Sequence, residues 1–290
     1  MLRNAAVITL LLTKLAGFVV AHKFYASFIE NMFDDSYFLG WEHRVRTTLM
    51  LLMELLELIL IVITLFAHTV TLRDKSYKLL RIIFVVYFLF ELPYYIAGYF
   101  GLGDFASEWL MILSLVILGA KIFCLVAFIR ASPLLPLAKV NLADFELVTN
   151  TSTGHRFVHG LLDTLIMMPQ LLQLSQGTYY EGYGPGMQVL SVALFYGSYF
   201  IYYTVSESLF GQTFGKVFTN SCVVGHGKTL TTGQIVMRSL FRYIPVDAFT
   251  FLAGANWHDK LSSTAVVYVN SWENAFAEVG HEEETAQKPV

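Results

Sequence analysis

The chain has 290 residues, of which 56% are hydrophobic and only 14% are charged. Soluble domains carry about 25% charged residues, so this composition argues against a soluble domain and indicates a membrane protein with several spans. The formal net charge of -3 is too small to indicate binding to nucleic acid or to another polyanion. The two cysteines, Cys124 and Cys222, lack the spacing of a metal site or a disulfide.

A transmembrane helix needs about 20 apolar residues. The segments that meet this length are residues 5–29, 47–71, 79–100, 107–129, 156–175 and 187–206. The first of them could also be a signal peptide, but Lys14 interrupts its apolar run, so we interpret it as a span. Lysine and arginine follow the second, fourth and sixth spans, and this asymmetry predicts a multi-pass protein with a cytoplasmic N-terminus.

Two prolines, Pro133 and Pro136, end the fourth predicted helix, because proline cannot continue the helical hydrogen-bond ladder. A polar stretch follows them. The sequence therefore predicts a four-span helical bundle over residues 1–130, a cytoplasmic linker over 131–153, a membrane domain over 154–269 and an acidic tail over 270–290.

After the sixth span, residues 217–224 and the β-branched run at 264–269 are typical of strands. If these strands pair, both lie on one side of the membrane, and residues 234–256 between them form a re-entrant or interfacial helical hairpin instead of a seventh span. Two arginines and a central proline in that segment favour this interpretation. The predicted fold class is an all-α polytopic membrane protein with about six transmembrane helices, this hairpin and a small cytoplasmic β-hairpin.

Arg156 and Asp163 are the first candidate site residues. They lie seven residues apart, nearly two helical turns, so both side chains fall on one face of the fifth span. A carboxylate inside the hydrocarbon layer is costly without a partner or water, so we interpret Asp163 as an ion or proton site with Arg156 as its charge partner. Glu207, Asp247 and Asp259 are candidates for gating or supporting groups. The alternative is a structural clamp, in which Arg156 pairs with Asp259 or Asp163 and ties the hairpin to the fifth span.

The front bundle carries its own intramembrane charges, namely Lys14, Glu54, Glu57, Glu91 and Lys121. Glu54 and Glu57 share a helix face, so their two carboxylates would repel each other if both were ionised. One of them would tend to hold a proton, and Lys14 or Lys121 could neutralise the other. A polar pathway through the bundle and a set of ion pairs that hold the helices together are both open at this point.

The region from about residue 154 to residue 269 resembles the RDD family of bacterial membrane proteins, which is named for one arginine and two aspartates. Arg156 and Asp163 match the arginine and the first aspartate in spacing. Glu207 ahead of Gly211-Gln-Thr-Phe-Gly-Lys216 is similar to the family's stretch after its second span. The block His258-Asp259-Lys260-Leu261 before a valine-rich strand is similar to its last block, and Asp259 would be the second aspartate. Asp247 competes for that role.

The resemblance implies a location in the cell inner (plasma) membrane and, loosely, ligand transport or sodium–proton exchange. The first hypothesis is therefore a transporter or cation/proton exchanger with small cations or protons as ligands. The second is a membrane scaffold or assembly subunit whose residues 1–150 bind a protein partner or a second copy. Nothing in the sequence argues for an enzyme, a cofactor or nucleic acid, and His155 and His159 lack the glutamate of a metal-hydrolase motif.

Overall fold

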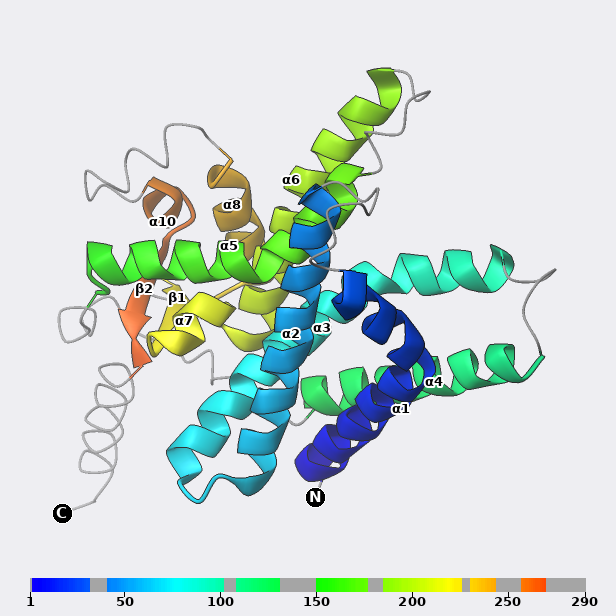
Figure 1. Cartoon of the computed structure of the whole chain (residues 1–290). Coiled ribbons are helices and arrows are strands. Elements are labelled where there is room, and N and C mark those ends of the chain that lie inside the picture. The colour runs from blue at the N-terminus through cyan, green and yellow to red at the C-terminus, as the bar shows by residue number, and fades with distance from the viewer. Residues whose placement is uncertain are drawn as a thin grey trace, which may run out of the picture. The chain divides into compact units, whose positions relative to one another are not determined.

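The structure is a computed structural model (Figure 1) and is largely helical, with one two-stranded sheet, as the sequence predicts. It describes residues 2–31, 41–101, 108–130, 150–176, 185–225, 230–243 and 257–269. The chain divides into two compact units. The first comprises Met1–Ser132 with Ile166–Phe195, and the second comprises Pro133–Leu165 with Tyr196–Val290. This division passes through helices α5 (Thr153–Gln176) and α6 (Pro185–Phe210).

The first unit contains the four helices of the front bundle. They are α1 (Leu2–Asn31), α2 (Trp41–Phe66), α3 (Val70–Gly101) and α4 (Glu108–Arg130). Helix α2 packs against α3, and α1 packs against α4. Helix α3 begins nine residues before the predicted span at residue 79, so the basic stretch expected as a loop forms its first turns. Among the described helices, the part of α2 from Thr47 to Phe66 alone has the length and apolar composition of a membrane span. The count of six spans stays a prediction.

The charges of the front bundle form ion pairs between helices. Lys14 Nζ lies 2.5 Å from Glu54 Oε2 and 2.6 Å from Glu57 Oε2, and this links α1 to α2. Lys121 Nζ lies 2.5 Å from Glu91 Oε2 and links α4 to α3. These distances favour the interpretation of ion pairs that hold the helices together.

The second unit contains the sheet. Strands β1 (Ser221–Gly225) and β2 (Thr264–Tyr268) pair antiparallel, with Ser221 opposite Tyr268 and Gly225 opposite Thr264. The predicted pairing is confirmed, but β1 begins four residues later than predicted. Residues Phe214–Phe218 form the short helix α7 instead. The backbone before α5 also joins the sheet, because the Thr151 nitrogen donates to the Val266 oxygen at 3.0 Å.

Helices α8 (Thr232–Phe241) and α10 (Trp257–Leu261) lie in the chain between the two strands. Helix α8 begins with a capping box, in which Thr231 and Gln234 satisfy each other's backbone nitrogens. The predicted hairpin over 234–256 is only partly covered, since residues 244–256, including Asp247, lie outside the described residues.

Candidate functional site

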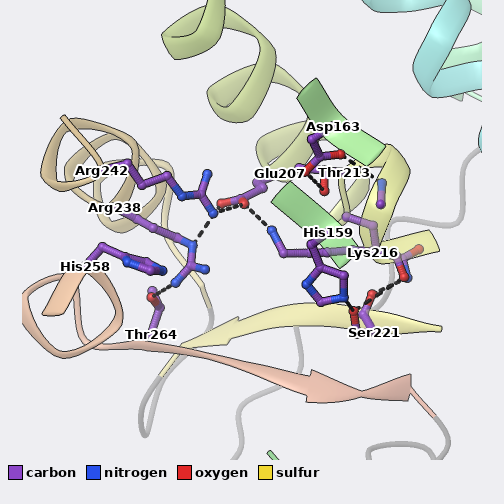
Figure 2. A network of polar contacts seen from close by, with 12 residues as sticks. His159, Asp163, Glu207, Thr213, Lys216, Ser221, Arg238, Arg242, His258 and Thr264 are labelled. Carbon is purple, nitrogen blue, oxygen red and sulfur yellow. Dashed lines mark hydrogen bonds and ion pairs between the residues drawn. The ribbon is translucent and has the colours of Figure 1, made fainter. Parts of the chain in front are cut away.

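A buried carboxylate, Glu207 near the end of α6, lies among three cationic side chains of the second unit (Figure 2). Lys216 of α7 brings its Nζ to 2.5 Å from Oε1 of Glu207. Arg242, which follows α8, brings its Nη2 to 2.8 Å from the same oxygen. Arg238 of α8 forms an ion pair through its Nε, 3.2 Å from Oε2. The Glu207 side chain is fully buried, so these cations replace the water it would otherwise require.

Arg238 continues the network to a second carboxylate. Its Nη1 bonds to Oδ1 of Asp259 in α10 and donates to Thr264 Oγ1 at 2.9 Å. The other oxygen of Asp259 bonds to Nη1 of Arg156 at the start of α5. The resulting chain of contacts runs from Arg156 through Asp259 and Arg238 to Glu207, so it joins α5, α10, α8 and α6 within one unit.

Arg156 and Asp163 are not ion-pair partners among the described contacts, contrary to the charge pairing predicted from the sequence. Arg156 pairs with Asp259, and its Nε donates to Thr151 Oγ1 at 3.1 Å. The physical reason is distance along the helix. Seven residues correspond to about 10 Å of rise, so two side chains on the same face need not meet. The packing of α10 supplies Arg156 with a closer carboxylate.

Asp163 is held by hydrogen bonds from neutral groups. It is 1% exposed. Tyr202 donates its hydroxyl to Oδ1 at 2.6 Å, Thr213 donates to Oδ2 at 2.8 Å, and the Gly215 nitrogen donates to Oδ1 at 2.8 Å. Thr213 precedes α7 but does not cap that helix with its own side chain. Asp163 therefore satisfies an N-terminal nitrogen of α7 from the neighbouring helix, as a capping residue does within one helix.

Helix α7 lies unusually close to α5 at Gly215. A Cβ atom at this position would be 2.6 Å from the His159 oxygen and 2.7 Å from its Cα, which no ordinary packing allows. Glycine is therefore required there for the backbone to approach. The same approach brings His159 Nε2 to 3.0 Å from Ser221 Oγ at the start of β1. Just ahead of α7, Gly211 ends α6 with a φ of 66°, a conformation that favours glycine.

Burial also affects the protonation of Lys216. Burial lowers its pKa to about 8, although the neighbouring Glu207 acts in the opposite direction. Arg242 and Arg238 also lower this pKa. The Glu207 carboxylate therefore offsets part of the cost of burying the charge of Lys216.

A pocket of about 630 Å³ adjoins the network within the second unit. Its wall includes four cationic side chains and Asp163, together with Tyr199, Tyr203 and Tyr243. The guanidinium carbon of Arg242 lies 3.9 Å from the centre of the Tyr203 ring, a cation–π contact that helps to hold this arginine in place. The arrangement is a pocket with largely apolar and aromatic walls into which four cationic side chains are built.

The structure brings together Arg156, Glu207 and Asp259 in one network and places Asp163 on the same pocket, whereas Asp247 lies outside the described residues. Sequence reasoning did not assign site roles to Lys216, Arg238, Arg242, Tyr202 and Thr213. The arginines four residues apart and the lysine of the glycine-bounded stretch were the signals available. Among the described residues, no group of three or more histidine, cysteine, aspartate or glutamate side chains could hold a metal ion.

Comparison with known proteins agrees with this region. Residues 151–269 match the model of the RDD family, and this confirms the resemblance seen in the sequence. The matched region begins at the bridge to the sheet and ends just after β2, so it contains the whole network. No curated protein and no solved structure matches the chain. The RDD match supports a membrane location and association with the lipid bilayer.

Proposed function

We propose that this membrane protein, whose residues 151–269 carry the RDD region, is a transporter with its solute site in the pocket of the second unit. The observation that carries the proposal is the pocket itself, about 630 Å³ in volume and lined by Arg156, Lys216, Arg238 and Arg242. Ionisable side chains around a cavity of a membrane protein commonly mark a solute pathway, and ligand pockets typically enclose about 300–1,000 Å³. We further propose a multi-pass protein of the plasma membrane with a cytoplasmic N-terminus.

Asp163 is the group that best suits proton coupling in this proposal. It lines the pocket and accepts hydrogen bonds from two hydroxyl groups, those of Tyr202 and Thr213. A hydroxyl group can rotate and accept instead of donate. Asp163 can therefore take up a proton without a backbone movement, while the Gly215 nitrogen keeps its acceptor.

The charge balance makes a bare cation a poor cargo for this pocket. The network contains four cationic side chains and two carboxylates, and Asp163 adds one further carboxylate to the pocket. A positive charge remains, and it would repel a sodium ion. Sodium–proton exchange, the activity that the RDD resemblance implies, thus has less support from this pocket than transport of another solute coupled to protons.

Gly160 offers a way to fill the pocket without removing any polar group. The residues of α5 that line the pocket run from Arg156 to Thr164. At about 100° of rotation per residue, Gly160 lies at the centre of their arc. A Cβ atom there meets nothing within 4 Å, and the same holds at Gly197 of α6, which does not line the pocket. Gly160→Leu should fill the pocket and abolish solute flux into proteoliposomes, whereas Gly197→Leu should leave the pocket open and keep that flux.

A second candidate function, a membrane scaffold, is favoured by one observation. Both oxygens of Asp259 are bonded to arginines, and both oxygens of Asp163 accept hydrogen bonds. These contacts tie α5 to α7 and α10, as a structural clamp would. In this interpretation residues 1–150 bind the protein partner.

Arg156→Ala and Asp259→Ala are expected to lower stability, and to do so non-additively. Each removes one partner of an ion pair whose side chains are 10% and 8% exposed, so each should cost about 3–5 kcal/mol. The double variant should lose less than the sum of the two single losses, by about 0.5–3 kcal/mol.

Denaturant unfolding of the purified variants in detergent measures these losses of stability. Additive losses would show that the pair is not coupled. Non-additive losses, together with a wild-type protein that transports no solute in proteoliposomes, would favour the scaffold.

A further inference from the structure

We infer that the pocket of the second unit binds an oxyanion, namely phosphate or a phosphate ester. This inference rests on the proposed function in one respect: it names the chemical class of solute for the same pocket. The charges of the pocket, its unused hydrogen-bond donors and the apolar side chains of its wall support this assignment.

The charges call for an anion. Four cationic side chains, those of Arg156, Lys216, Arg238 and Arg242, line the pocket. Two carboxylates within the network and Asp163 balance only three of these charges. Asp163 is moreover occupied by donors from Tyr202, Thr213 and Gly215. A buried excess of positive charge is costly, and a bound anion would neutralise it.

Two buried donors on the pocket wall have no hydrogen-bond partner among the described residues. One is the hydroxyl of Ser239, a residue that is 1% exposed, and the other is Nη1 of Arg242. Ser239 lies in the last turn of α8 and Arg242 directly follows this helix, so the two residues are three positions apart and fall on one helix face. Buried polar groups are nearly always hydrogen-bonded. Both donors are closed off from solvent, so an oxyanion bound in the pocket would supply their missing acceptor after a small movement of the wall.

The guanidinium of Arg242 is already oriented for such a ligand. Its Nη2 donates to Glu207 Oε1 at 2.8 Å, and its guanidinium carbon lies 3.9 Å from the centre of the Tyr203 ring. Lys216 approaches Glu207 from α7, as Figure 2 shows, and adds an ammonium group to the same wall. Donors on separate elements suit a ligand with several oxygens, and guanidinium groups bind phosphate particularly well.

The wall also contains apolar side chains at the outer side of α5. Phe157 is 60% exposed and Leu161 is 48% exposed, and both line the pocket. An apolar substituent on the phosphate would contact them. The ligand chemistry is therefore shared by free phosphate and by the headgroup of an anionic phospholipid.

Ligand-dependent thermal unfolding of the purified full chain in detergent tests the inference. Inorganic phosphate is added in one series and phosphatidylglycerol in another, with sodium chloride of equal ionic strength and phosphatidylcholine as their controls. A specific ligand about a hundredfold above its Kd should raise Tm by about 5–10 °C. A rise with phosphate alone identifies the free ion, and a rise with phosphatidylglycerol alone identifies the lipid headgroup.

Three variants make the result specific to this pocket. Ser239→Ala removes a hydroxyl that makes no hydrogen bond among the described residues, so it should keep the fold and weaken binding about tenfold. Gly160→Leu should eliminate the shift, while Gly197→Leu should keep it. Absence of a shift in well-folded wild type, or an equal shift in Gly160→Leu, would overturn the inference. A ligand-dependent rise in Tm without solute flux would support the oxyanion site and reject the transporter. Solute flux without such a rise would support the transporter and reject the oxyanion site.

Discussion

Glu207→Gln is expected to lower the free energy of unfolding by about 3–5 kcal/mol. Glutamine keeps the shape and one acceptor oxygen but removes the only charge that faces Lys216, Arg238 and Arg242 together among the described residues. The three cations would then remain buried without this counter-charge. Denaturant unfolding of the purified protein in detergent measures the loss.

Asp74→Asn is the matched control for Glu207→Gln. It makes the same carboxylate-to-amide change at an ion pair with Arg3, whose side chains are 28% and 47% exposed. Partly exposed pairs of this kind contribute about 1 kcal/mol or less. Equal losses in the two variants would show that the buried network does not stabilise the second unit as its geometry indicates.

Gly215→Ala is expected to have the second largest effect, a loss of about 3 kcal/mol or more. The added methyl group would lie 2.6 Å from the His159 oxygen, so α7 must move away from α5. That movement also breaks the hydrogen bond from the Gly215 nitrogen to Asp163. Thermal unfolding, with limited proteolysis around α7, measures both consequences.

Gly160→Ala serves as the control for this backbone contact. Its methyl group would meet no atom within 4 Å, so helix propensity alone should act and stabilise α5 by about 0.5–1 kcal/mol. If both alanine variants were equally stable, the close approach of α7 to α5 would not exist in the folded protein.

The sequence predicts the elements of the second unit better than their contacts. The β-branched run at residues 264–269 and the strand pattern around residue 221 are enough to predict the pairing of β1 with β2. Helix α7 was missed because Phe214–Phe218 has the composition of a strand. Its helical form is supported by the bond from Gly215 to Asp163, a contact between residues 52 positions apart.

At the candidate site, too, the sequence predicts which residues take part better than it predicts their contacts. Helical spacing correctly places Arg156 and Asp163 on one side of α5, since both line the pocket. It cannot say which carboxylate meets Arg156, because that depends on where α10 packs. The excess of arginine and lysine over acid in the pocket also depends on packing, since Lys216, Arg238 and Arg242 are spread over 27 positions of sequence from first to last.

Solute flux in proteoliposomes tests the central claim most directly. Wild type, Gly160→Leu and Gly197→Leu are reconstituted at equal density, and sodium-driven proton movement and phosphate uptake are recorded in each. We predict phosphate uptake, and little sodium-driven proton movement, in the wild type and in Gly197→Leu, whereas Gly160→Leu should show only the uptake of protein-free vesicles. Undiminished flux in a well-folded Gly160→Leu variant, or no flux of any of these ions in well-folded wild type, would contradict a solute pathway through this pocket.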